Sequence, residues 1–225
     1  MEIERKNMVR NQIRPIGVDD NNVIGAMLEI PRHKFISQKF SSVAYSDAEL
    51  PILEDNNRKL IARPEMLAKL LAAAEIARDD VVLEIGCGTG YATAIISKIA
   101  RQVVGIDSCK KSIDKANKLA EDLNMKNIVF NYQDLKEEFD ISDFSIIIVN
   151  GAALTREAVD ISNVCDPKDF FSFDSRDLIN NLVRNFNKKI ICVEGYYKYS
   201  PMHVVVYQEG VRNQLDEIYL PEIML

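Results

Sequence analysis

The chain has 225 residues, of which 47% are hydrophobic and 28% charged, an ordinary composition for a globular protein with one well-buried core. Its formal net charge of −6 argues against a general nucleic-acid binder and against docking on anionic membranes, because both need a basic surface. No apolar run approaches roughly 18 residues, and the charged N-terminus lacks the apolar core of a signal peptide. We therefore expect a cytoplasmic protein.

Cysteine and histidine are sparse and scattered. The four cysteines show no C-x-x-C spacing, and the two histidines lie far apart in the sequence and outside any nucleophile-elbow motif. The residues concerned are Cys87, Cys109, Cys165, Cys192, His33 and His203. The sequence thus predicts no metal site, no disulfide framework and no nucleophile that depends on histidine.

The first 64 residues are expected to form a helical lobe in front of a main domain of residues 65–225. Residues 1–50 are predicted to hold two short helices and a loop. Asp19 is the expected cap of the second helix, and Pro31 is expected to end it. The apolar positions of that helix are Val23, Ile24, Met27 and Leu28.

A helix is predicted over residues 63–77, with Pro64 in its first turn, and from residue 81 strands alternate with helices. Such alternation, with nearly continuous apolar strands, predicts an α/β fold: a doubly wound, mostly parallel sheet of seven strands with helices on both faces. The expected strands cover 81–85, 102–107, 127–132, 145–150, 188–195, 203–208 and 214–221. The last two are expected to pair antiparallel through a turn at Glu209–Gly210.

Three connecting segments complete the predicted order of elements. Ala92 to Ile99 has helical spacing, and Ser108 is the expected cap of an amphipathic helix that follows the second strand. The segment 154–176 has no clear period, so we interpret it as an irregular insertion before a helix at about 175–185.

Three glycines follow the first strand of the sheet directly, at Gly86, Gly88 and Gly90. Ligands of open parallel sheets bind beyond the carboxyl ends of the strands, where glycine lets them approach the backbone closely. Asp107 ends the second strand 21 residues after Gly86, which is the spacing expected for a carboxylate that accepts two ribose hydroxyls. A dinucleotide loop would need glycine where the chain has Tyr91, which disfavours a nicotinamide-dependent oxidoreductase.

The series E-x-G-x-G-x-G from Glu84 to Gly90 resembles the first motif of class I S-adenosylmethionine-dependent methyltransferases. The resemblance implies a Rossmann-like methyltransferase fold that binds S-adenosyl-L-methionine. It implies that Glu84 and the glycines accommodate the methionine and ribose parts of the donor. It further implies that the "YQDL" segment places Asp134 and Leu135 at the adenine.

The region before the glycines narrows the family. The stretches "MVRNQIRPIGVDDNNVIGAMLEIPRHKFI" and "AYSDAELPI" closely resemble the N-terminal motifs of protein-L-isoaspartate O-methyltransferases, and the resemblance runs from Met8 to Ala153. It implies methyl transfer from S-adenosylmethionine to the α-carboxylate of an isoaspartyl residue, with a damaged protein or peptide as acceptor.

The acceptor side departs from this family. Where the family has G-Q-T-I-S-x-P, Leu60 stands in place of the threonine, Ala62 in place of the serine and Lys59 in place of the glutamine. The motifs therefore leave two alternatives open, a catalyst of the family's reaction or a donor-binding relative with a changed acceptor or a sensor role. The basic residues Arg58, Lys59 and Arg63 are interpreted as a solvated loop, with an anionic ligand or the acceptor carboxylate as the alternative.

Overall fold

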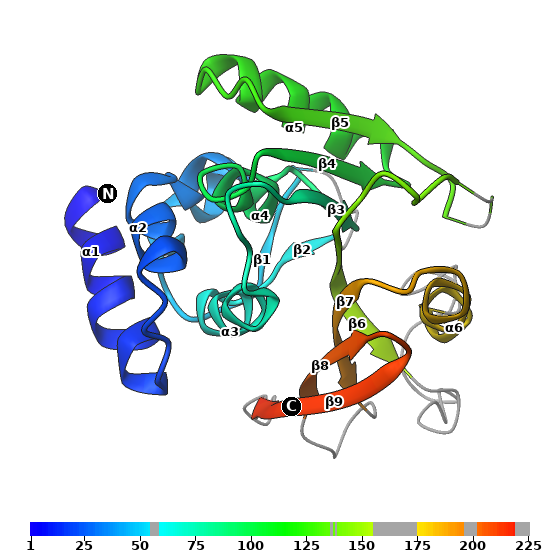
Figure 1. Cartoon of the computed structure of the whole chain (residues 1–225). Helices are drawn as coiled ribbons and strands as arrows, with labels where there is room; N and C mark the ends of the chain where they lie inside the picture. Colours follow the sequence, from blue (N-terminus) through cyan, green and yellow to red (C-terminus); the bar gives the residue numbers. More distant parts are fainter. Residues whose placement is uncertain (55–58, 136, 138, 155–174, 196–201, 219–225) are drawn as a thin grey trace, which may run out of the picture.

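The computed structural model describes residues 1–54, 59–135, 137, 139–154, 175–195 and 202–218 (Figure 1). Its centre is a seven-stranded sheet in the order β5-β4-β3-β6-β7-β8-β9. The strands are β3 (Val81–Ile85), β4 (Gln102–Asp107), β5 (Ile128–Tyr132), β6 (Ile146–Leu154), β7 (Lys189–Gly195), β8 (Met202–Gln208) and β9 (Val211–Ile218). The strands β5 to β7 are parallel, and β8 and β9 run antiparallel to their neighbours, which confirms the predicted fold class.

The order of the strands reverses at β3. From β3 the chain first builds outward to β4 and β5, and it then returns to place β6 on the other side of β3. In such a sheet the crevice at the carboxyl end of the first strand is the usual ligand site, because the connections leave β3 and β6 in opposite directions. The glycine segment that follows β3 therefore lies at the switch point of the fold.

Helices cover both faces of the sheet. On one face lie α3 (Pro64–Ala74), α4 (Tyr91–Ile96) and α5 (Lys110–Asp122), and the amphipathic α6 (Ser175–Asn185) covers the other (Figure 1). Alternate residues of each strand supply the two faces, since side chains in a strand point to opposite sides. In β3, Val82 packs under α3 and α4, whereas Leu83 packs toward α6.

The N-terminal segment packs beside α3 and α4, on the side of the molecule away from α6 (Figure 1). It contains α1 (Glu2–Met8), which continues as a π-helical turn, and α2 (Asn21–Glu29). A two-stranded hairpin follows, β1 (Leu50–Pro51) with β2 (Leu60–Ile61), which the sequence did not predict because two residues carry no periodicity.

One hydrophobic core joins this lobe to the main domain. Met27 and Phe35 of the lobe belong to the same buried cluster as Leu67, Tyr91 and Ile95. The buried hydrophobic residues of the first 64 all belong to this cluster, so the lobe shares its core with the sheet and its helices. The division at residue 64 stays a prediction.

Four local predictions were wrong in detail. Asp20, not Asp19, caps α2, because its Oδ1 accepts hydrogen bonds from the amides of Asn22 at 2.8 Å and Val23 at 3.1 Å. Ser108 caps nothing: α5 begins after Cys109, which makes no side-chain cap bond. The strand predicted at 145–150 runs on to residue 154. The strand predicted at 214–221 begins earlier, at residue 211. The interpreted insertion at 154–176 falls almost wholly outside the described residues.

Candidate functional site

The glycine segment turns back beneath the end of β4. Gly86 and Cys87 both donate backbone hydrogen bonds to the Ile106 carbonyl, at 2.8 and 3.1 Å, and the Gly90 amide closes the turn on Cys87 at 2.8 Å. Gly86, Gly88 and Gly90 have φ angles of 80°, 55° and 85°. Three left-handed residues in five bend the chain sharply, and the backbone at Gly86 and Gly88 lines a pocket without a side chain of its own.

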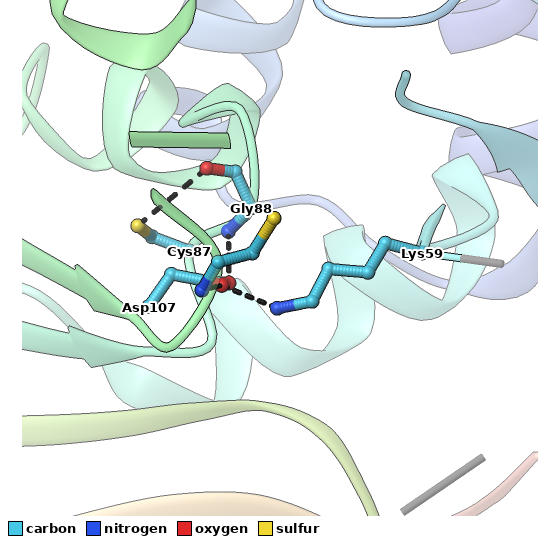
Figure 2. Close-up of polar contacts among 5 residues, drawn as sticks. Lys59, Cys87, Gly88 and Asp107 are labelled. Atoms are coloured by element: carbon cyan, nitrogen blue, oxygen red, sulfur yellow. Dashed lines mark hydrogen bonds and ion pairs between the residues drawn. The ribbon is translucent and has the colours of Figure 1, made fainter. Parts of the chain in front are cut away.

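The Asp107 carboxylate lies directly against this loop, as the spacing predicted. Its Oδ2 accepts a hydrogen bond from the Gly88 amide at 2.9 Å, and its Oδ1 accepts one from the Cys109 amide at 2.7 Å. The Lys59 ammonium also bonds to Oδ1 (Figure 2). The structure thus brings a buried carboxylate, the glycine loop and the lobe together at one strand end.

Glu84 supports the site from beneath and does not line it. The residue is fully buried, and its two carboxylate oxygens accept hydrogen bonds from Thr93 Oγ1 and from Asn150 Nδ2, the latter at 2.7 Å. Burial raises the pKa of Glu84 to about 7, and the bonds from Thr93 and Asn150 oppose that rise. Glu84 therefore ties the strand β3 to the helix α4 and to Asn150 in the middle of β6.

Replacing Glu84 by glutamine should make stability less dependent on pH. The folded pKa of Glu84 lies above its unfolded value, so its contribution is fully present below about pH 4.5 and is lost as the pH rises to about 7. The shift corresponds to about 3 kcal/mol. Between pH 5 and pH 8 the wild type should therefore lose up to about 3 kcal/mol of unfolding free energy relative to Glu84→Gln. Urea unfolding at both pH values measures it.

The matched control for this prediction is Glu121→Gln, which also replaces a carboxylate by an amide but at an exposed position of α5. The control should follow the wild-type pH dependence. Parallel stability curves for wild type and Glu84→Gln between pH 5 and pH 8 would contradict a raised pKa at Glu84.

A small pocket, with a cavity volume of about 30 Å³, lies between the loop and the lobe. The lobe contributes an apolar wall, and the main domain contributes backbone and small polar groups together with Leu67, Tyr91 and Ala92. The wall consists of Ile52, Leu60, Ile61 and Ala62. The facing residues include Gly86, Gly88, Thr89 and Asn150. Leu60 and Ala62 thus line the pocket together, as the family motif predicted for the residues at their positions.

Side chains of the main domain fasten the lobe over the pocket. Thr89 Oγ1 donates a hydrogen bond to the Phe35 carbonyl, and Lys115 Nζ donates to the carbonyls of Ile36 and Ile52, both at 2.8 Å. The sequence pattern did not predict this contact of Thr89. Burial lowers the pKa of Lys115, and the nearby charge of Glu54 opposes this.

Arg32 organises the lobe from within. Its guanidinium is fully buried and donates hydrogen bonds to the carbonyls of Ala44 and Ala62 at 2.8 Å and of Ala48 at 3.2 Å. It also lies 5.2 Å from the centre of the Tyr91 ring. One side chain thereby connects the loop after α2, the pocket wall at Ala62 and the first residue of α4.

Asp134 and Leu135 follow β5 at the same edge of the sheet. The Gln133 amide donates a hydrogen bond to the Asp107 carbonyl at 3.1 Å, which holds this turn beside the end of β4. Leu135 packs against the apolar cluster under α6, and Asp134 is half-buried. The role of both residues at an adenine stays a prediction.

Two of the three basic residues before α3 have partners in the fold and are not part of a solvated loop. Arg63 is 7% exposed and pairs with Asp47 at 3.6 Å, and Lys59 is bound to Asp107. Arg58 lies outside the described residues. Sequence reasoning also missed Asn150 as a partner of Glu84, although its place at the end of the strand predicted at 145–150 was a usable signal.

In the part of the chain that the structure describes, no group of three or more histidine, cysteine or acidic side chains could bind a metal. Within the same residues, no helix is long and apolar enough to span a bilayer. Burial raises the pKa of the Cys87 thiol, which keeps this pocket residue in its neutral form.

Comparison with known proteins agrees with the geometry of the site. Residues 3–155 match the model of the protein-L-isoaspartate(D-aspartate) O-methyltransferase family. The chain is 36% identical over 157 residues to the protein-L-isoaspartate O-methyltransferase of Petrotoga mobilis, covering 68% of this chain and 71% of that protein. It is 35% identical over 156 residues to that of Geobacter metallireducens, covering 68% and 69%.

A solved structure of a protein-L-isoaspartate O-methyltransferase has the same fold, with a TM-score of 0.67 over 96% of this chain and 22% identity. The present chain covers 64% of that longer chain, and the alignment to the relative from Desulfosudis oleivorans, at 39% identity, covers 58% of each protein. The predicted family and the predicted type of enzyme are confirmed by these matches. The chain belongs to the protein-L-isoaspartate O-methyltransferase family of S-adenosylmethionine-dependent methyltransferases.

Proposed function

We propose that this chain transfers the methyl group of S-adenosyl-L-methionine to a carboxylate of an isoaspartyl residue in a damaged protein or peptide. The observation that carries the proposal is the meeting of the glycine loop, the Asp107 carboxylate and the pocket wall of the lobe at the switch point of the sheet. The cytoplasmic location expected from the sequence stays a prediction.

The residues present fit this donor. Asp107 is 2% exposed and offers a carboxylate at the strand end, where ribose hydroxyls are accepted in folds of this class. A Cβ on Gly86 would lie 3.0 Å from the Asn150 carbonyl oxygen, and one on Gly88 would lie 3.0 Å from Ile52 Cδ1. Side chains at these two positions would crowd Asn150 and Ile52, so the glycines let β6 and the lobe pack closely against the loop.

The chemistry demands little acid–base catalysis from the protein. The donor supplies an activated methyl group on a sulfonium, and the acceptor carboxylate is already ionised at pH 7. The chain must align the two groups and keep water out. Ile52, Leu60 and Ile61 provide an apolar wall for that purpose, and Arg32 and Lys115 hold the wall in place.

A second candidate function is favoured by one observation on the same wall. Leu60 and Ala62 line the pocket without a hydroxyl group, where the family motif has threonine and serine. A hydrogen bond to a charged group contributes about 1.5–3 kcal/mol, which is about one to two powers of ten in rate. The alternative is therefore a donor-binding relative with a different acceptor or a sensor role.

Restoring both hydroxyls tests these two functions. The double variant Leu60→Thr, Ala62→Ser should methylate an isoaspartyl peptide about ten- to a hundredfold faster than wild type if no other group holds the acceptor. Transfer of a labelled methyl group measures the rate, and calorimetry with S-adenosylhomocysteine should show the same donor affinity for both proteins. A wild type that already works at the rate of the double variant would show that the two hydroxyls are dispensable here.

Donor binding itself is tested on the wild type. S-Adenosylhomocysteine should bind one site per chain, and NAD should not bind. Absence of isoaspartyl methylation with intact donor binding would favour the changed acceptor, whereas absence of both would overturn the proposed function.

A further inference from the structure

Lys59 is a charged residue of the lobe whose ammonium reaches the carboxylate beside the glycine loop. It directly precedes the short strand β2, and its side chain extends across the site to the Asp107 carboxylate (Figure 2). The Asp107 side chain is 2% exposed and that of Lys59 is 32% exposed, so the pair is largely withdrawn from water. This ion pair joins β2, one residue before Leu60, to the end of β4.

The Asp107 carboxylate has little capacity left for a ligand while Lys59 is bound. An ionised carboxylate offers about four acceptor positions. The Gly88 amide, the Cys109 amide and the Lys59 ammonium already take three of them. Two ribose hydroxyls need two positions, so binding of a ribose through both hydroxyls requires Lys59 to leave.

The other described cations around the pocket are committed to the protein. Arg32 is bound to three backbone carbonyls, Lys115 to two, and Arg63 to Asp47. None of these contacts involves a group that a donor would claim. Lys59 differs from them because its partner is the carboxylate that the donor needs.

We propose that Lys59 is the residue that binds the acceptor carboxylate in this protein, and that it is held on Asp107 until the donor ribose takes Asp107 over. The acceptor part of this inference rests on the proposed function, and the release of Lys59 does not. The displaced ammonium remains attached next to Leu60 and Ala62, on the wall that lacks the family's hydroxyls. The acceptor carboxylate is the anion that the reaction brings to this wall, and an ammonium holds it as strongly as a hydroxyl does.

This arrangement couples the two substrates. The released Lys59 ammonium and the donor's sulfonium are both positive, so they repel each other unless a carboxylate lies beside them. The released Lys59 therefore favours arrival of the acceptor after the donor. Binding is therefore ordered: the donor binds first and releases Lys59, and the released Lys59 completes the acceptor site.

The variant Lys59→Gln tests both parts, since glutamine is close in length, is uncharged and stands at this position in the family motif. Calorimetry with S-adenosylhomocysteine should show about fivefold tighter binding than in wild type, because the variant has no ion pair with Asp107 that must break before the ribose binds. Initial rates with an isoaspartyl peptide should show a KM raised about tenfold with a smaller change in kcat. Lys59→Arg, which keeps the charge, should restore the peptide KM. Lys118→Gln, an exposed change of the same charge on α5, should leave both measurements as in wild type.

The outcomes separate the parts of the proposal. Donor affinity that is unchanged or weaker in Lys59→Gln would overturn the release of Lys59 by the ribose. Tighter donor binding with a wild-type peptide KM would overturn the acceptor role. A wild type that binds S-adenosylhomocysteine but never methylates the peptide would overturn the isoaspartyl function. The donor affinity of Lys59→Gln would still decide whether Lys59 must leave Asp107 before the donor binds.

Discussion

Replacing Gly90 by alanine should destabilise the protein by about 2–5 kcal/mol and remove measurable binding of S-adenosylhomocysteine. Gly90 has a φ of 85°, and a Cβ there would lie 2.4 Å from Cζ of Phe130. The left-handed conformation alone costs an alanine about 1–2 kcal/mol, and the overlap with a ring packed under α5 adds an amount typical of overpacking. Urea unfolding and calorimetry measure the two effects.

Other glycines of the chain separate the two causes. Gly17 has the same φ of 85° but nothing within 4 Å of its Cβ position, so Gly17→Ala should show the conformational cost alone. Gly25 lies inside α2 with open space around it and an ordinary φ, and Gly25→Ala should stabilise the helix slightly. The pair Gly90→Ala, Phe130→Leu should recover part of the loss. Equal losses at Gly90 and Gly17 would show that the contact with Phe130 is unimportant.

Replacing Arg32 by methionine should cost about 3–5 kcal/mol of unfolding free energy. Methionine fills much of the same volume but leaves the carbonyls of Ala44, Ala48 and Ala62 without their donor. Each unsatisfied buried carbonyl costs about 1–3 kcal/mol, less where water can enter. The position of Ala62 in the pocket wall should also loosen, so the peptide KM should rise along with the loss of stability.

Two further variants test the cause of this loss of stability. Arg32→Lys keeps the charge but lacks the planar fork, and it should recover part of the stability because an ammonium at the end of a single stem cannot reach all three carbonyls. Arg78→Met removes an exposed arginine and should change stability by less than about 0.5 kcal/mol. A loss below 1 kcal/mol in Arg32→Met would mean that water replaces the guanidinium.

The sequence by itself determined the order along the chain of the seven strands of the main sheet and the place of the glycine loop. Buried parallel strands are continuous apolar runs, so β3 at 81–85 and β4 at 102–107 were predicted with the boundaries that the structure shows. The position of Asp107 at the end of β4 follows from the same pattern, because the residue after an apolar strand lies at the edge where ligands bind. Local periodicity and spacing are enough for such features, since neighbours in the chain create them.

Only the tertiary structure decided which side chains meet at the site. Lys59 and Asp107 are 48 residues apart, and Glu84 and Asn150 are 66 apart, so no local pattern connects them. The interpretation of the basic residues as solvated failed for that reason: their partners lie on other elements, and burial of Asp107 and Arg63 is a property of the assembled lobe and sheet. The choice between Asp19 and Asp20 as cap was likewise made by the face of α2 that packs inward. Contacts across the chain depend on packing, which single-sequence periodicity does not contain.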